Sequence, residues 1–550
     1  MVKRSKVTII VLVISVLNIQ LILPNTGVYA RELADIQYGP TVNMLTQNSV
    51  VIAWRTTTPG FSRVRFGLDS SVENVVENST LVNNHEVKLK GLEFNTTYYY
   101  QVETAEISSD IYQFHTAKGF TDPFMFAFLG DNRPQTEIIE QPEVFSSITN
   151  NIIASSPDLV MHGGDDIDAK VGQSSEIRYA QWKAFRDITD QSHHNTPWIF
   201  AIGNHDDPEN YGPASFTEIF TQPIDADPFE RFFSFDYGNS HFIVLDTERD
   251  VSKISGAQWE WLVQDLAKNT AIHTFILFHR PLSTPYIYPV LIRERGLIQY
   301  PEGQKLLDLA LNHSITAFLV GHDHMYNKKT VGWRNITQIV SAGGGAPLYV
   351  GEKDGGVFHH VELSIDWKEV WVKVILANGT LYDEFQIDTP YNIIYPNRPN
   401  ITSVTANSVF EEEQALDVEV IATALSPEVQ LWYSNHRTDW TFITMSISDN
   451  STHFSGSIPN LPSTNQGTFY IRIVDKTGNF TVSDLYNYIV HSKPTTEPTS
   501  SSQTSTETTH STSSTTTPVS TPGYLLPTLF TAFFSVSLFH RRKRLKKSFK

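Results

Sequence analysis

The sequence of 550 residues predicts a multidomain protein in which an α/β domain lies between two β-sandwiches. In residues 36–118, apolar and polar residues alternate in short runs separated by turn residues, which is typical of antiparallel strands. In residues 121–389, apolar runs of strand length alternate with helical patterns, which is typical of βα units. Residues 399–490 return to short alternating runs. We therefore expect three folded domains, at about residues 31–118, 119–392 and 393–492.

The first 30 residues have the pattern of a secretory signal peptide. Basic residues at positions 3, 4 and 6 precede an apolar run over 7–23, and small residues at 28 and 30 suit a cleavage site after Ala30. An uncleaved membrane anchor is the alternative interpretation. Either segment would direct the following domains out of the cytoplasm.

The chain contains no cysteine, so the folded domains have no disulfides and the protein has no disulfide-linked partner. Small secreted domains often depend on disulfides, but domains of this size can bury a core without them. Eight Asn-x-Ser/Thr sequons are consistent with a glycosylated exterior.

Residues 31–118 predict a β-sandwich of the fibronectin-III type. Alternation is clear in residues 49–54 and 97–102, and turn residues separate the runs. Residues 91–100 resemble the tyrosine-bearing segment of such modules. We expect the tyrosines at 98–100 to be core and corner residues and not ligands.

The α/β domain, residues 119–392, carries the chemistry. Five apolar runs, at 124–129, 158–162, 198–202, 274–278 and 317–320, are each followed by Asp, Asn or His. In open α/β sheets the functional site lies at the carboxyl ends of the strands, so these five ends can converge. The residues that follow the runs are Asp131, Asp165, Asn204, His279, His322 and His324. Oxygen donors mixed with imidazoles suit a pair of first-row metal ions, with one carboxylate as a bridge.

Other segments of this domain predict its framework. Helical patterns occur at 142–154, 178–189, 257–269 and 303–312, and the third places Trp259, Leu262, Val263 and Leu266 on one apolar face. Residues 241–246 predict a further inner strand, after which Asp246 is expected to be a structural carboxylate. The glycine-rich residues 341–347 predict a turn near the rim of the site.

The motif series resembles the calcineurin-like metallophosphoesterase superfamily. The motifs are Gly-Asp at 130–131, Gly-Asp-x-x-Asp at 164–168, Gly-Asn-His-Asp at 203–206, His279 and Gly-His-x-His at 321–324. The last motif and the order of domains are most similar to the purple acid phosphatase branch, over about residues 36–386. The resemblance implies a four-layer αββα sandwich with the site at its apex, behind a fibronectin-III-like domain.

The resemblance also implies a role for each residue. Two ions, of iron, manganese or zinc, would be held by Asp165, Asn204, His279 and His322 on one side and by Asp131, Asp165 and His324 on the other. Asp165 would bridge them. A metal-bound hydroxide would attack the phosphate, and His205 would donate to the leaving oxygen or to a phosphate oxygen.

The sequence departs from the family at the first ion. Most members have Asp-x-His at the first motif, but here the third position is Arg133. The purple acid phosphatases have a tyrosine three residues after the bridging Asp, where this chain has Asp168, so a tyrosine–iron(III) arrangement is not supported. The fourth ligand would be Asp168 or water. Arg133 would either clamp a phosphate oxygen or be an ordinary surface residue.

The C-terminal third predicts a surface tether. Residues 393–492 resemble an immunoglobulin-like module, a spacer or weak binding module. Residues 493–523 are almost entirely Ser, Thr, Pro and Glu, a composition typical of an extended O-glycosylated stalk. Residues 524–539 are apolar but short of the about 20 residues that span a bilayer, and residues 540–550 are basic. They would be a membrane span or an archaeal-type sorting signal.

We therefore expect an exported, surface-anchored phosphoesterase that hydrolyses monoesters of small phosphorylated substrates. A phosphodiesterase or nucleotidase of the same fold is one alternative. A non-catalytic surface binding protein with a degenerate first ion position is another, favoured by Arg133 and Asp168. The net charge of −18 argues against a nucleic-acid scaffold role, which would need a basic face.

Overall fold

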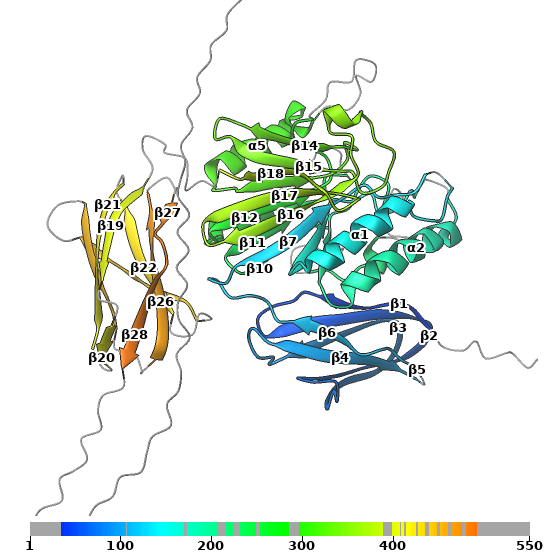
Figure 1. Ribbon diagram of the computed structural model, residues 1–550, viewed down its shortest axis with the longest axis horizontal. Helices are drawn as coiled ribbons and strands as arrows, with labels where there is room; N and C mark the ends of the chain where they lie inside the picture. The colour runs from blue at the N-terminus through cyan, green and yellow to red at the C-terminus, as the bar shows by residue number, and fades with distance from the viewer. Residues whose placement is uncertain are drawn as a thin grey trace, which may run out of the picture. The chain divides into compact units, whose positions relative to one another are not determined.

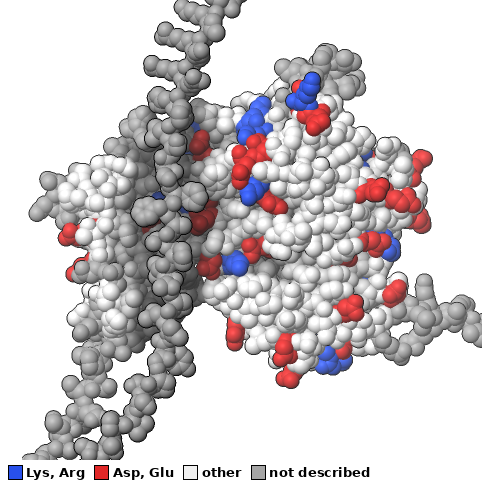
Figure 2. Space-filling model, in the orientation of Figure 1, with Lys and Arg blue, Asp and Glu red and all other residues white. Residues whose placement is uncertain are grey.

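The computed structural model describes residues 35–491, except for 106, 136, 170–172, 207–215, 224–230, 249–253, 255, 285–295, 389–398, 407–408, 412–413, 425–426, 435–438, 448–451, 460–463 and 476–479. The predicted signal peptide, stalk, apolar segment and basic tail lie outside the described residues. Within the described part, we find no helix of the length and apolar character needed to cross a membrane. On the face in Figure 2, acidic and basic side chains are interspersed and acidic ones are more frequent.

The first domain is a β-domain whose six strands are joined by one hydrogen-bonded network. The strands are β1 (Ile36–Asn43), β2 (Ser49–Gly67), β3 (Asn74–Lys90), β4 (Thr97–Thr104), β5 (Ile107–Ser108) and β6 (Tyr112–His115). The long strand β2 pairs with β1 up to Thr56 and with β4 after Ser62, with register shifts between these halves. The predicted β-domain is confirmed, and its division into the two sheets of a sandwich stays a prediction. Tyr98 and Tyr100 are buried, and the Tyr98 hydroxyl accepts a hydrogen bond from the backbone N–H of Glu93.

The α/β domain contains two six-stranded sheets (Figure 1). The first has the order β18 (Leu381–Gln386), β17 (Glu369–Leu376), β16 (His359–Asp366), β7 (Phe124–Leu129), β8 (Leu159–His162), β9 (Trp198–Phe200). The second has the order β10 (Phe233–Tyr237), β11 (Ser240–Val244), β12 (His273–Phe278), β13 (Ala317–Val320), β15 (Ile336–Ser341), β14 (Tyr326–Val331). The strands β7, β8 and β9 are parallel to one another, as are β11, β12, β13 and β15.

The core of this domain lies in three layers of apolar contacts. Between the sheets, Phe126 packs edge-to-face against Phe242 and Phe275, with ring centroids 5.3 Å apart in each pair. Helices α1 (Glu143–Ser155) and α2 (Ser175–His193) share a buried cluster with the outer side of the first sheet, and they lie side by side in Figure 1. Helices α4 (Gly256–Lys268) and α5 (Pro301–Asn312) share another with the second sheet. These contacts make four layers in the order αββα.

The prediction for α4 was only partly right. Leu262 and Leu266 are buried as expected, and Trp259 packs against the cluster, but Val263 is 36% exposed. Gln258 is buried on the inner face in place of Val263. Its side-chain amide accepts a hydrogen bond from the backbone N–H of Asp246 and donates one to the backbone carbonyl of Asp246. The remaining short helical segments are α3 (Phe216–Ile219), η1 (Leu297–Gln299) and η2 (Glu352–Asp354).

The C-terminal region forms two further sheets. One contains β19 (Asn400–Ala406), β21 (Leu416–Thr423), β25 (His453–Ile458) and β24 (Ser446–Ile447). The other contains β20 (Val409–Glu411), β28 (Tyr486–His491), β26 (Thr464–Val474), β22 (Glu428–Ser434), β23 (Thr441–Thr444) and β27 (Phe480–Val482). Residues that alternate along β21, such as Val418 and Val420, share one buried cluster with Leu431 and Ile471 of the other sheet. Each sheet therefore buries one face against the other.

Candidate metal centre

The predicted ligands follow the carboxyl ends of strands from both sheets. Asp131, Asp165 and Asn204 follow β7, β8 and β9 of the first sheet. His279 directly follows β12, and His322 and His324 follow β13 of the second. Asp131, Asp165 and His322 have φ angles of 60°, 60° and 71°, a region that non-glycine residues seldom adopt. Such conformations cluster at functional sites, where the surrounding structure holds them in place.

Glycines allow these strand ends to approach closely. A Cβ atom on Gly163 would lie 3.4 Å from the backbone nitrogen of Gly321, so the ends of β8 and β13 are nearly in contact. A Cβ atom on Gly203 would lie 2.2 Å from the backbone nitrogen of Asp165. Any larger residue at position 203 would therefore push the Asn204 loop away from the Asp165 loop.

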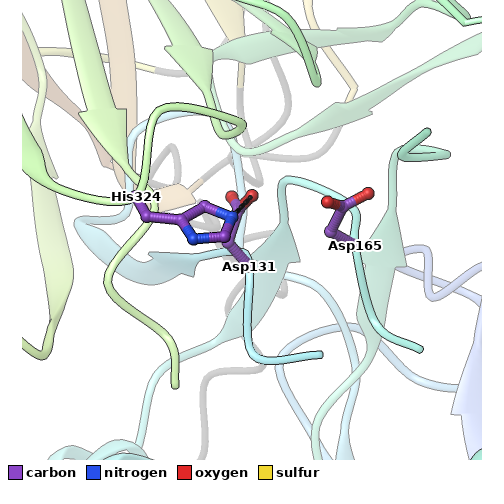
Figure 3. A group of neighbouring side chains, drawn as sticks. All are labelled: Asp131, Asp165 and His324. Atoms are coloured by element: carbon purple, nitrogen blue, oxygen red, sulfur yellow. Dashed lines mark ion pairs between the residues drawn. The ribbon is translucent and has the colours of Figure 1, made fainter. Parts of the chain in front are cut away.

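Three side chains make the first candidate ion position. Asp131, Asp165 and His324 are buried, and their donor atoms all lie within 4.8 Å of one another (Figure 3). The His324 ring and the Asp131 carboxylate point toward each other in Figure 3, and Nε2 lies 3.5 Å from Oδ1. The Nδ1–H of His324 donates to the carbonyl of Pro347, at 2.7 Å, which leaves Nε2 as the nitrogen that faces the aspartates.

The surroundings of the Asp131 carboxylate suit a cation beside it. Within the described part of the chain, its Oδ1 atom is buried and has no hydrogen-bond partner. Burial, with repulsion from Asp165, raises the pKa of Asp131 well above its usual range. A buried anion is unfavourable unless it is paired or coordinates a metal, so the residues present fit a cation here.

Four side chains make the second candidate position. The His279 Nε2 atom lies 3.1 Å from Asn204 Oδ1, 3.1 Å from His322 Nδ1 and 3.4 Å from Asp165 Oδ1. Separations near 3 Å are those expected between ligands that each lie about 2 Å from one ion. The Nδ1–H of His279 donates to the carbonyl of Gly163, so Nε2 is free to coordinate. Asp165 contributes to both positions.

Burial prepares the histidines for coordination. It lowers the pKa of His279 to about 3 and that of His324 to about 4, so both rings are neutral near pH 7. A neutral imidazole offers the lone pair that a metal ion needs. For Asp165, burial opposes ionisation, but His279 and His205 outweigh it and hold the pKa of the carboxyl below its ordinary value.

Asp168 lies beside His205 and Arg133, and not in the group of donor atoms around Asp131. Its Oδ1 atom is 2.7 Å from His205 Nδ1 and 3.2 Å from the Arg133 guanidinium. The Arg133 Nε–H also donates to Asp165 Oδ2, at 3.3 Å. Sequence reasoning offered Asp168 or water as the fourth ligand, and Arg133 as a phosphate clamp or a surface residue. In the structure, Arg133 donates to two buried carboxylates and Asp168 contacts the His205 ring, and the roles of both residues stay predictions.

His205 is accessible to a substrate. Its side chain is 25% exposed, whereas that of Asp168 is 1% exposed. Since Asp168 accepts from Nδ1–H, the Nε2 atom is the one left to face the site, 4.0 Å from Asp165 Oδ2. This is the geometry that a proton donor needs, and the Asp168 contact was not predicted from the sequence.

Asp206 is a further residue that sequence reasoning missed. Its carboxylate accepts hydrogen bonds from the backbone N–H groups of Gly203, Asp165 and Asp166, at 2.7, 2.8 and 2.7 Å. It thereby ties the loop after β8 to the loop after β9. Asp206 is the fourth residue of the Gly-Asn-His-Asp motif, and this position could have indicated its role, but sequence reasoning gave it none.

The glycine-rich segment after β15, predicted as a turn near the rim of the site, lies beside the first candidate ion position. The backbone N–H of Gly344 donates to the carbonyl of Gly130, and that of Ala346 donates to the carbonyl of Asp131, each at 2.9 Å. A Cβ atom on Gly344 would lie 2.4 Å from the Gly130 oxygen. The segment therefore holds the Asp131 loop by its backbone.

Two further charged residues lie beside the second position. The Arg280 guanidinium is 2.9 Å from His322 Nε2, and its Nε–H donates to Glu248, at 2.9 Å. Burial raises the pKa of Glu248, although Arg280 opposes the shift. Neither residue was singled out from the sequence.

Comparisons with known proteins agree with this geometry. Residues 37–116 match the purple acid phosphatase N-terminal domain, and residues 124–326 match the calcineurin-like phosphoesterase family. A purple acid phosphatase of Glycine max is 23% identical over 354 residues, which are 57% of this chain and 70% of that protein. "Probable inactive purple acid phosphatase 9" of Arabidopsis thaliana is 27% identical over 284 residues, 44% of this chain and 42% of that protein.

A solved structure shows the same fold. The purple acid phosphatase PPD1 from yellow lupin (Lupinus luteus) seeds superposes with a TM-score of 0.54 at 18% identity, over 63% of this chain and 73% of that one. The matched families, the order of the two domains and the gathered ligand set agree. Residues 37–326 therefore match the two domains of a purple acid phosphatase, and the chain carries a purple acid phosphatase-like, metal-dependent phosphoesterase domain of the calcineurin-like kind.

Proposed function

We propose that the protein is an exported, surface-anchored phosphoesterase that uses two metal ions to hydrolyse phosphate monoesters. One observation carries the dinuclear part of this proposal. Asp165 lies within reach of Asp131 and His324 on one side and of His279 on the other, as a shared ligand must. Ions bound there would supply an activated water molecule and offset negative charge on the phosphoryl oxygens.

The residues of the chain would then donate a proton to the leaving group and hold the ions in place. His205, oriented by Asp168, faces the site with Nε2 and would give a proton to the departing alcohol oxygen. Its exposure allows contact with a bound ester. The buried ligands Asp131, His279 and His324 would hold the ions in a fixed arrangement, because their second atoms are already bonded or buried in the protein.

A hydrolysis assay tests this proposal. Full-length protein loaded with manganese, zinc or iron is offered p-nitrophenyl phosphate and bis(p-nitrophenyl) phosphate, and Asp165→Asn is the matched control. We expect the monoester to be cleaved faster than the diester and the variant to be inactive. Faster cleavage of the diester would instead favour a phosphodiesterase or nucleotidase.

A non-catalytic surface binding protein is the second candidate. It is favoured by Arg133 and Asp168, which occupy positions where the related families have ligands and which bond to each other instead. Bound metal with hydrolysis of neither ester would support this candidate. The assay therefore separates the two functions when metal content is measured on the same samples.

Export and anchoring are proposed from the terminal segments. Residues 1–30 have the signal-peptide pattern, and residues 493–550 combine a Ser/Thr/Pro-rich stretch, an apolar segment and a basic tail. The C-terminal β-region would act as an immunoglobulin-like spacer. Protease treatment of intact cells should release the phosphoesterase domain, and protection of that domain from protease would contradict an external location.

A further inference from the structure

Arg280 extends from the end of β12 toward the second ion position. It directly follows His279, and its guanidinium lies 2.9 Å from His322 Nε2. Its side chain is 19% exposed, so part of the guanidinium can be reached from solvent.

A buried carboxylate holds this guanidinium in position. The Arg280 Nε–H donates to Glu248 Oε2 at 2.9 Å, and the Glu248 side chain is 7% exposed. Glu248 is itself fixed, because its backbone N–H donates to Asp246 Oδ1 and its Oε1 accepts from the Thr247 hydroxyl. Since β11 and β12 are neighbouring parallel strands, the two partners emerge side by side.

The surroundings of Arg280 suit an anion. Metal ions at the candidate positions would repel the Arg280 guanidinium. An anion bound between the ions and the guanidinium would be attracted by both. His322 faces His279 with Nδ1, so an ion held there would leave Nε2 protonated, as a donor. The Arg280 N–H group that contacts His322 Nε2 could no longer donate to that nitrogen, and a phosphate oxygen would accept its hydrogen bond.

Arg133 differs from Arg280 in this respect. Arg133 donates to two carboxylates, Asp165 and Asp168, which are 2% and 1% exposed. Arg280 donates to Glu248 and lies against an imidazole. Arg133, for which a phosphate contact was one of two expectations, therefore pairs with carboxylates of the candidate site, whereas Arg280 lies against the His322 ring on the other side of that site.

We infer that Arg280 binds a phosphate oxygen and that Glu248 is the residue that positions it. This deepens the proposed function, because it assigns the recognition of the doubly charged phosphate of a monoester at the same site. A planar guanidinium is suited to two phosphate oxygens at once. A diester carries one negative charge and offers fewer free oxygens, so its binding should depend less on Arg280.

Calorimetric titration of inorganic phosphate into the metal-loaded full-length protein tests this inference. We expect Arg280→Gln to weaken phosphate affinity about tenfold or more, and Arg280→Lys to weaken it less. Glu248→Gln should weaken affinity in the parent protein but add little in the Arg280→Gln background, as a double-mutant cycle reveals. The matched control is Arg55→Gln, because Arg55, in β2 of the first domain, also pairs with a carboxylate, that of Glu218, at 3.0 Å and has similar exposure.

The outcomes separate this inference from the proposed function. Phosphate affinity within about twofold of the parent for Arg280→Gln, at equal metal content, would overturn the inference. So would a parent protein that binds no phosphate. If phosphate binding weakens as expected but the parent hydrolyses no ester, the inference stands and the catalytic proposal fails. In an active parent, Arg280→Gln should raise KM for the monoester more than for the diester.

Discussion

The two candidate ion positions share Asp165 but differ in their other partners. The second position gathers Asn204, His279 and His322 around one point, with donor atoms about 3 Å apart. The first gathers Asp131 and His324. The family resemblance implies a further ligand at position 133, where this chain has Arg133, which donates to Asp165. The same strand-end geometry thus supports one position with four protein donors and another with three.

This difference teaches that the framework and the ligand set can change independently. Asp131 keeps its unusual backbone conformation and its glycine-rich support although the neighbouring ligand is missing. Arg133 and Asp168, at positions where the family resemblance implies ligands, form an ion pair with each other. The first position is therefore expected to bind its ion less tightly than the second.

Replacement of the shared ligand should have the largest effect. Asp165→Asn weakens both positions at once, so we expect turnover to fall about a thousandfold or more. Bound metal should fall with it, while the circular dichroism spectrum stays that of the parent. Retention of most activity would show that Asp165 is not shared.

Single ligand variants should separate the two positions. His322→Ala removes a ligand of the second position and His324→Ala one of the first, and each should lower turnover on the order of a hundredfold. By mass spectrometry, each variant should lose about one equivalent of metal. Loss of both ions from either variant would mean that the positions do not fill independently.

The pairing of Asp168 with His205 gives a smaller effect. Asp168→Asn leaves the ion ligands in place but no longer holds the His205 ring by a charged partner, so kcat should fall about tenfold. The loss should be greater for an alkyl phosphate than for p-nitrophenyl phosphate, because only the alkoxide leaving group depends on a proton donor. Equal losses on both esters, with lost metal, would make Asp168 a ligand.

Restoring an imidazole should have the smallest effect. Arg133→His places a coordinating ring where related proteins have one, and we expect the weaker of two manganese-binding steps to tighten about tenfold. Arg133→Gln is the control, because it removes the positive charge without adding an imidazole ring. If both variants tighten binding equally, charge and not coordination accounts for the difference between the positions.

The sequence could predict the residues that face the site because each follows an apolar run. Asp131, Asp165, Asn204 and His279 come after β7, β8, β9 and β12, and parallel strands bring such ends to one edge. The alternation of strands and helices also predicted βα units, whereas the four layers were expected from the family resemblance. These features follow from local patterns along the chain, and such patterns can be read from a single sequence.

The pairings between loops could not be predicted in the same way. The contact between Asp168 and His205 joins loops after two different strands, and so does the contact between Glu248 and Arg280. Their geometry depends on how each loop turns after its strand. The continuous sheet of the first domain likewise depends on β2 pairing with different partners along its length, which alternation alone does not reveal.

Anomalous scattering from crystals of the manganese-loaded protein tests the central claim most directly. The account predicts two peaks about 3.5–4 Å apart, with one Asp165 oxygen near each. His279, His322 and Asn204 should surround the stronger peak. A single peak, or an ion that Asn204, His279 and His322 do not share, would contradict it.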